Sequence, residues 1–148
     1  KAVMECKGKV TPEFKRLIGY VTSFASGCLY CQAHTILGAE RFGCTKKRLE
    51  EVWNYANSSA FSSAEKAALD FASAAASVPN KVTGKEVSQL KNYWNDYDIV
   101  EIMGVIALFG FLNRWNDSMG SALEDLPIEK GKEHLMENTN WTPGKHRV

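Results

Sequence analysis

The sequence predicts an all-α protein of about six helices. Apolar residues recur at helical spacing along most of the chain, and no segment shows the strict alternation of a half-buried strand. A capping residue is repeatedly followed by an acid within three positions, which is typical of helix starts. Finally, the stretch 99–112 is apolar nearly all round apart from Glu101, so it predicts a central helix that other helices cover on most sides.

Three helices are expected in the N-terminal part of the chain. The first begins at Thr11, which precedes a proline and a glutamate, and it ends near Gly27. The second follows directly, contains two cysteines close to its start and ends at Gly43. The third begins after Thr45 and continues to the polar run 57–59, where the helical pattern ends.

Three more helices are expected further along. The fourth opens at Ser62, which has a glutamate three positions later, and it ends before Pro79. The fifth opens at Thr83 with the same spacing of threonine and glutamate. The sixth is the apolar helix, which opens at Asp98 and runs to about Gly120.

Length and composition indicate one soluble globular domain over residues 1–148. With 45% hydrophobic and 24% charged residues the chain can bury a substantial core, expected at about 11–125. The segment 126–148 contains two prolines and scattered charge, and we expect a tail that wraps the domain or packs on a neighbour through Trp141. The chain opens on Lys1 rather than on a methionine, which is compatible with a truncated N-terminus.

The charge balance narrows the range of partners. Eighteen basic and seventeen acidic residues give a net charge of +1, so no electrostatic case exists for a nucleic acid or an anionic membrane as partner. The longest apolar stretch is too short to span a bilayer. Four cysteines are too few for a disulfide-stapled secreted scaffold, and their spacing suits an intracellular redox or metal site. We therefore expect a cytoplasmic protein.

The run 27–34 carries the clearest chemistry. Cys28 and Cys31 stand three residues apart at the expected start of the second helix, where the helix dipole lowers the pKa of a thiol. His34 follows three residues later, next to Cys31 on the helix surface, and can accept the proton of its thiol. Cys28 can then convert a sulfenic acid on Cys31 into a disulfide. These three residues are the predicted catalytic residues.

Other interpretations of the cysteines remain open. Cys6 and Cys44 lie outside the motif, and we expect both to be small buried hydrophobic residues. A zinc ion is the main rival to a redox pair, because the motif offers three ligands in Cys28, Cys31 and His34. The fourth ligand would be one of Cys44, His134 and His146. Redox chemistry is favoured, since zinc sites usually draw on two separated clusters and no second cluster is present.

Polar residues also gather at the end of the apolar helix. We expect them to mark the exit of the helix into solvent, with salt bridges; the alternative is that they line a pocket near the thiols. This cluster consists of Asn113, Arg114, Asn116 and Asp117. Tyr30, between the two cysteines, is expected to pack, with donation of its hydroxyl to a bound oxygen as the alternative.

The sequence resembles the AhpD-like, carboxymuconolactone decarboxylase superfamily over roughly residues 11–125. The resemblance is greatest in the run 25–35 that contains both cysteines, and continues through Gly38-Ala39-Glu40-Arg41-Phe42-Gly43. The segments 63–72, 98–102 and 109–117 resemble the later helices of the family.

This resemblance implies an all-helical fold, assembly into trimers or hexamers, and alkylhydroperoxidase or disulfide-reductase activity of the branch with two cysteines. It implies that Cys31 reacts with the hydroperoxide and that Cys28 resolves the product. No haem, flavin or other cofactor is implied, because electrons come from a thiol donor or a partner reductase. Decarboxylation belongs to members without the cysteine pair and is disfavoured here.

Two positions depart from the family's proton relay. The family has a histidine four residues after the second cysteine, where this chain has Thr35, and a glutamate twelve residues before the first, where this chain has Arg16. Glu13 and Glu40 are candidate substitutes for that glutamate. The departures motivate an alternative function, in which the protein is a non-catalytic, oligomeric redox-sensing or binding member of the superfamily.

Overall fold

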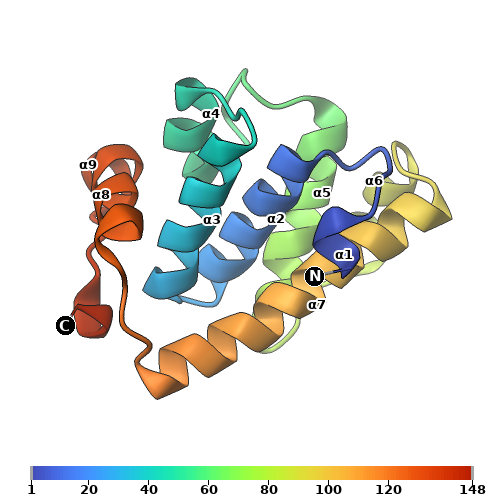
Figure 1. Cartoon of the computed structure of the whole chain (residues 1–148). Helices are drawn as coiled ribbons and strands as arrows, with labels where there is room; N and C mark the ends of the chain where they lie inside the picture. The colour runs from blue at the N-terminus through green and yellow to red at the C-terminus, as the bar shows by residue number, and fades with distance from the viewer. Residues whose placement is uncertain (1, 148) are drawn as a thin grey trace.

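The computed structural model describes residues 2–147, and within that range every regular element is a helix. Figure 1 shows the arrangement. The all-α prediction is confirmed. No helix in the described part of the chain has both the length and the hydropathy needed to cross a membrane. The elements in chain order are α1 (Ala2–Glu5), α2 (Pro12–Ala25), α3 (Leu29–Arg41), α4 (Lys46–Glu51), η1 (Val52–Asn54), α5 (Ser63–Ala76), α6 (Gly84–Lys91), α7 (Asp96–Met119), α8 (Asp125–His134), α9 (Met136–Thr139) and η2 (Gly144–His146).

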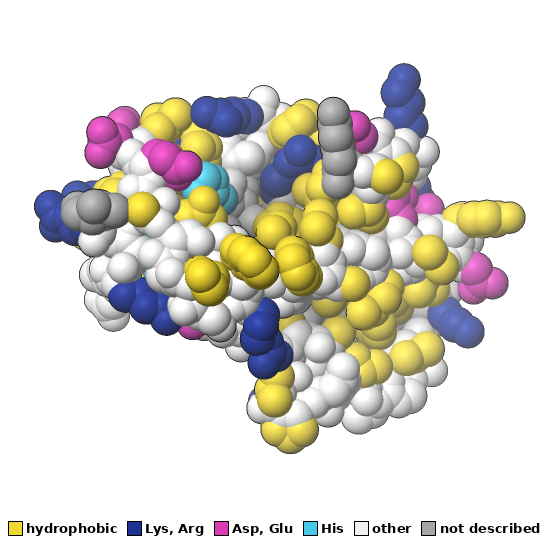
Figure 2. Space-filling model, turned by 60° about the horizontal axis from the view of Figure 1, so that its bottom comes forward, with side chains coloured by type: hydrophobic (Ala, Val, Ile, Leu, Met, Phe, Trp, Pro, Cys, Tyr) yellow, Lys and Arg dark blue, Asp and Glu magenta, His cyan; other side chains and the backbone are white. Residues whose placement is uncertain are grey.

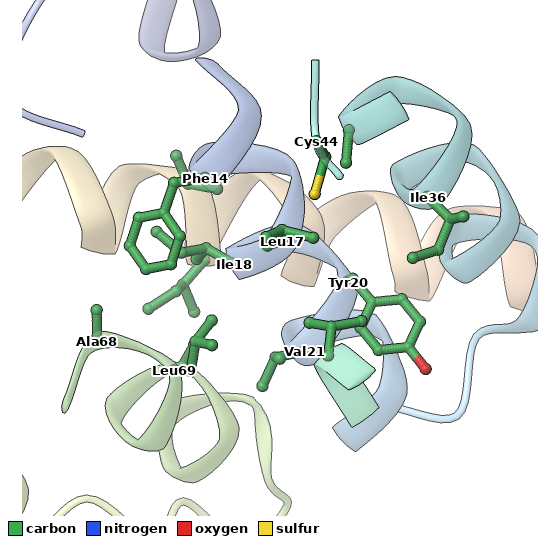
Figure 3. Packing of buried hydrophobic residues seen from close by; sticks show 14 of the residues in the cluster. Phe14, Leu17, Ile18, Tyr20, Val21, Ile36, Cys44, Ala68 and Leu69 are labelled. Carbon is green, nitrogen blue, oxygen red and sulfur yellow. The ribbon is translucent and has the colours of Figure 1, made fainter. Parts of the chain in front are cut away.

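Helix α2 lies at the centre of the bundle, in contact with α3, α5 and α7 (Figure 1). Its side chains Phe14 and Ile18 face Leu69 of α5, while Ile36 of α3 lies across the other side of the helix (Figure 3). Leu17 and Ile18 are completely buried. Burial of a Leu or Ile side chain contributes about 1.5–3 kcal/mol, so this central helix holds the site-bearing helices together.

The helix starts follow the predicted caps, with one displacement. The hydroxyl of Thr11 accepts the N–H of Phe14 at 3.2 Å, and Ser62 forms a reciprocal capping box with the glutamate three residues later. The sixth predicted helix, α7, begins one turn earlier than expected. Asn95 is its cap, and Asp98 is the third residue of the helix, where its carboxylate accepts the N–H of Asn95 at 3.2 Å.

Two further expectations are wrong, one on the third predicted helix and one on Cys6, and the tail contains helices that were not predicted. The third predicted helix is interrupted, because α4 ends at Glu51 and the chain continues as a short 3-10 turn. The tail is largely helical: α8 runs through Pro127, which is tolerated because it lies in the first turn, where no N–H partner is needed. Cys6 is exposed, whereas the predicted burial of Cys44 is confirmed. The thiol of Cys6 instead donates to a carboxylate oxygen of Glu101 at 3.2 Å.

Helix α7 packs on the bundle along one side, and α1 covers it near Gly104, but much of its remaining surface is exposed, contrary to the expectation of cover on most sides. It packs closely on α2, where a Cβ on Gly19 would lie 2.5 Å from the ring of Phe109. Apolar side chains lie exposed along the rest of the helix, and Figure 2 shows apolar groups on this side of the molecule. They include Tyr97, Val100, Met103, Phe111, Trp115 and Met119. An exposed apolar face of this extent is typical of an interaction surface.

Replacing Leu17 by alanine tests the central position of α2. Because Leu17 is completely buried, the truncation leaves a cavity, and we expect the free energy of unfolding to fall by about 2–5 kcal/mol. Urea unfolding followed by circular dichroism measures this loss. The control is Lys91→Ala at an exposed position on α6, away from the apolar face of α7, which is expected to change stability by less than about 0.5 kcal/mol. Equal effects of the two substitutions would contradict the packing.

Candidate redox site

The turn between α2 and α3 sets the position of the two cysteines. Gly27 adopts φ +73°, a left-handed conformation that favours glycine, and it turns the chain sharply after α2. The next residue, Cys28, donates its backbone N–H to the carbonyl of Ser23 at 3.0 Å. Cys28 thereby becomes the N-cap of α3, and its sulfur accepts the backbone N–H of Cys31 at 3.4 Å. Both cysteines are buried.

The two thiols have opposite electrostatics. A hydrogen bond from the thiol of Cys31, together with the backbone N–H at the helix start, lowers the pKa of Cys28 despite its burial. The hydrogen bond to Cys28 and burial raise the pKa of Cys31. The first proton therefore leaves Cys28, and the thiol of Cys31 stabilises the resulting charge. The predicted contact of the two cysteines is present.

The C-terminal end of α7 reaches the same pair. Nδ2 of Asn116 donates to the sulfur of Cys31 at 3.7 Å, and this contact lowers the pKa of Cys31. The negative charge of Asp117 raises the pKa of both thiols. Asn113, one turn earlier, accepts the hydroxyl of Ser23 at 2.8 Å. Asn116 and Asp117 thus act on the thiols, and a salt bridge of the favoured interpretation is also present, between Asp117 and Lys145 at 3.1 Å.

A cavity of about 580 Å³ lies beside this region, between α2, α5 and α7. Asn113 and Asp117 line it together with Arg114 and Ser26, and apolar side chains such as Ile106 and Met103 complete its wall. Polar groups therefore lie at the end of the cavity nearest the cysteine turn, while its remaining wall is mostly apolar.

His34 lies one turn beyond the cysteines, and its partner is an acid of the C-terminal region. Its Nε2 is 3.0 Å from a carboxylate oxygen of Glu124, and its ring packs on Tyr30 with centroids 4.5 Å apart. Burial lowers the pKa of His34, and Glu124 opposes this effect. Acceptance of the Cys31 proton by His34 stays a prediction. The expectation that Tyr30 packs is confirmed by its two imidazole neighbours, His34 and His146.

Thr35 and Arg16, at the two positions of the family's relay, make structural contacts away from the thiols. The hydroxyl of Thr35 donates to the carbonyl of Cys31 at 2.8 Å, within the helix. The guanidinium of Arg16 stacks on the ring of Phe42 at 3.9 Å. Neither candidate substitute has the thiol pair as its partner: Glu13 pairs with Arg48 at 2.9 Å, and Glu40 pairs with Lys130 at 3.0 Å.

The last residues of the chain close over the start of α3. We call residues 141–147 the C-terminal strap. Nε1 of Trp141 donates to the carbonyl of Leu29 at 3.2 Å, and the ring of His146 lies 5.6 Å from that of Tyr30. Trp141 and His146 are both almost fully buried. The expectation that the tail wraps the domain through Trp141 is confirmed, and the strap covers the helix start that carries the cysteines.

The candidate zinc ligands of the rival interpretation do not come together among the described residues. Among the described residues, the group of side chains close enough to share a metal ion is Glu40, Glu133 and His134, which excludes the cysteine pair. The ammonium of Lys130 already bridges those two carboxylates at 3.0 and 2.8 Å. Cys44, His134 and His146 thus provide no fourth ligand beside Cys28 and Cys31, because Glu40 and Ser121 are the hydrogen-bond partners of the two imidazoles.

Sequence comparison identifies the family. The sequence model of the carboxymuconolactone decarboxylase family matches residues 1–74, which include the cysteine turn and all of α2 and α3. The chain belongs to this family. No curated protein matches it in sequence.

Solved structures with the same fold include a debrominase and a protein of unknown function. The debrominase Bmp8 in its apo form is similar, with 31% identity and a TM-score of 0.84 over 88% of this chain and 70% of that one. A cysteine-to-alanine variant of Bmp8 in complex with 2,3,4-tribromopyrrole gives 30% identity and the same TM-score and coverage. A protein of unknown function from Agrobacterium tumefaciens, described as a candidate antioxidant defence protein AhpD, shares the fold at 19% identity and a TM-score of 0.73, over 78% of this chain and 80% of that one.

Sequence reasoning missed Glu124 and the site position of His146. Glu124 follows the last predicted helix and has no periodic pattern around it. His146 was a candidate only as a zinc ligand, because nothing local indicates which helix the strap covers. Both residues contact side chains of α3 that lie about a hundred positions earlier in the sequence. Local sequence patterns do not predict contacts over such separations.

Substituting Cys31 by alanine tests the electrostatics of the pair. The thiol of Cys31 is the largest cause of the lowered pKa of Cys28, so its removal should raise that pKa and move alkylation of Cys28 to higher pH. Iodoacetamide labelling at a series of pH values, with peptide mass spectrometry, follows Cys28 alone. The matched control is Cys44→Ala, because burial raises the pKa of Cys44 to about 12 and it lies outside the pair. An unchanged profile in the Cys31 variant would refute the assigned hydrogen bond.

Proposed function

We propose that the protein is a thiol-dependent peroxidase that reduces organic hydroperoxides with Cys28 and Cys31 and takes its electrons from a thiol donor or a reductase. The hydrogen-bonded, buried pair at the start of α3 supports this most directly, because hydrogen bonds lower the pKa of one thiol and the second thiol lies next to it. Family membership agrees with a catalytic use of this helix start.

The reaction proceeds in two balanced steps. A thiolate attacks one oxygen of the O–O bond, which breaks; the sulfur becomes a sulfenic acid, and the leaving alkoxide takes a proton to become the alcohol. The second thiol then attacks the oxidised sulfur, which forms the disulfide and releases water. A donor dithiol returns two electrons and two protons and regenerates the pair.

We assign the attack to Cys31 and the resolution to Cys28. Once the reduced pair has lost one proton, the charge rests on Cys28, which accepts a hydrogen bond from the thiol of Cys31. Transfer of that proton to Cys28 moves the charge to Cys31, where the amide of Asn116 donates to the sulfur at 3.7 Å. Cys28 therefore acts first as the proton acceptor for Cys31, and afterwards as the resolving thiol.

Reductive debromination is a second candidate, favoured by the 31% identity to a debrominase. The same pair can perform it. A thiolate takes the bromine from the aromatic carbon, and the carbanion is protonated. The second thiolate then attacks the brominated sulfur, which forms the disulfide and releases bromide. Both reactions oxidise two thiols to one disulfide, and they differ in the group that is reduced.

Turnover assays with single-cysteine variants test the proposal. We expect the wild-type protein to consume cumene hydroperoxide over many cycles with dithiothreitol as donor, and Cys31→Ser to lose about a hundredfold or more of this rate. In Cys28→Ser, a sulfenic acid on Cys31 should be trapped by dimedone and located by mass spectrometry. Cys44→Ser is the control and should retain turnover.

Other outcomes of the same assays distinguish the alternatives. Unchanged turnover in Cys31→Ser would contradict the assignment, and a trapped sulfenic acid on Cys28 in Cys31→Ser would reverse the two roles. Oxidation that stops after one equivalent would favour the redox-sensing alternative. Debromination of 2,3,4-tribromopyrrole without consumption of hydroperoxide would favour the second candidate.

We also propose that the protein forms a homo-oligomer through the outer face of α7. Phe111 and Trp115 are 63% and 57% exposed on this face, and a helix that is apolar on all sides requires cover on more than one of them. A second copy of the chain supplies the same apolar face in return. The resemblance to trimeric and hexameric proteins agrees with this arrangement.

Charge substitution on α7 tests the assembly. Phe111→Glu combined with Trp115→Glu should lower the molar mass measured by light scattering from that of an oligomer to that of one chain, because two carboxylates would be buried without partners. Val87→Glu on α6, at a position 37% exposed, is the control and should leave the mass unchanged. A wild-type protein that elutes as a single chain would contradict the proposal.

A further inference from the structure

The C-terminal strap places a buried imidazole beside the cysteine turn. Nδ1 of His146 lies 2.8 Å from the carbonyl of Ser121. A carbonyl oxygen accepts hydrogen bonds, so Nδ1 carries the hydrogen and, in the neutral ring, Nε2 carries a lone pair. Nε2 is buried and has no hydrogen-bond partner among the described residues. Leaving a buried acceptor unsatisfied is costly, so this atom requires an explanation.

Asp117 is the acid nearest to that nitrogen. Its Oδ1 lies 3.6 Å from Nε2 of His146, and its Oδ2 lies 3.1 Å from the ammonium of Lys145. Asp117 follows Asn116, whose amide reaches the sulfur of Cys31, and its charge acts on both thiols. The carboxylate is therefore linked to the imidazole of the strap by a contact and to the cysteine pair by its charge.

We propose that Asp117 and His146 are the proton acceptor for the cysteine pair, in place of the relay whose positions Arg16 and Thr35 occupy. The S–H bond of one thiol breaks, its electron pair stays on sulfur, and the proton passes by way of Asp117 to Nε2 of His146. His146 is thus a positioning residue that acts through Asp117. In the peroxidase cycle the proton returns to the leaving alkoxide, and that part of the inference rests on the proposed function.

The charges around the site favour this transfer. While His146 is neutral, Asp117 repels a thiolate; once Nε2 is protonated, the imidazolium pairs with Asp117 and the repulsion falls. The ammonium of Lys145 pairs with the second carboxylate oxygen of Asp117 at 3.1 Å. From α3, Tyr30 covers the ring of His146, and the pair of His34 with Glu124 lies beyond Tyr30.

The test measures the reactivity of the reduced thiols in the full chain and needs no turnover. His146→Asn removes the base but retains a side-chain N–H close to the position of Nδ1, which preserves the donor to Ser121. We expect alkylation of the cysteine pair by iodoacetamide near pH 7 to become about tenfold slower, and its pH profile to move upward by about one unit. His134→Asn is the matched control, since that buried histidine pairs with Glu40 instead, and it should leave the profile unchanged.

A purely structural histidine gives the opposite result. If His146 only fastens the strap, its loss uncovers the buried thiols and alkylation becomes faster, or the profile stays unchanged; either result overturns the proposal. If turnover is absent in the wild type while His146→Asn still slows alkylation, the proton acceptor stands and the proposed function fails. If the wild type shows turnover but alkylation is unaltered in His146→Asn, the proposed function stands and the proton acceptor is refuted.

A second measurement avoids any change in the strap. The imidazole of His146 is titrated by NMR in the reduced wild type and in the variant Cys28→Ser with Cys31→Ser. Because coupled groups influence each other reciprocally, a nearby thiolate favours the imidazolium, and the midpoint of His146 should fall when the thiols are removed. The same midpoint in both proteins would overturn the proposal, even if His146→Asn does not fold.

Discussion

The cap of α3 is the interaction on which the rest of the site depends. A cysteine sulfur takes the place of the usual hydroxyl or carboxylate, and the backbone N–H of Cys31 that it accepts also stabilises its charge. The left-handed turn at Gly27 provides this cap, and α2 fixes the turn because it lies buried at the centre of the bundle. The same hydrogen bond thus caps α3 and helps to lower the pKa of the Cys28 thiol, so the fold directly determines the reactivity of the site.

Most of the fold follows from local signals in the sequence. Thr11 and Ser62 cap the helices that they predict, since capping depends on residues only three positions away. Contacts between segments that lie far apart in the sequence could not be predicted in this way. The exposed side of α7 was not predicted, because an all-round apolar pattern does not tell a buried helix from one that packs on another chain. The position of His146 was not predicted either, because the strap meets α3 through an isolated tryptophan and histidine without periodicity.

The same contrast applies to the candidate site. Cys28, Cys31 and His34 were identified from spacing, and the contact of the two cysteines is present in the structure. The partners that modify them, Asn116 and Glu124, come from α7 and the segment after it. Arg16 on α2 and Thr35 on α3 therefore do not supply the acid and the imidazole of the family's relay. The acids and the additional imidazole around the pair come instead from the C-terminal region.

The central claim is that Cys28 and Cys31 act together as a two-electron redox pair. The most direct measurement is the intact mass and the disulfide map of the reduced protein after addition of one equivalent of cumene hydroperoxide per chain. The account predicts a loss of two hydrogen masses, a peptide with Cys28 linked to Cys31, and Cys6 and Cys44 still reduced. Unchanged thiols at both motif positions, or oxidation that falls first on Cys6 or Cys44, would contradict it.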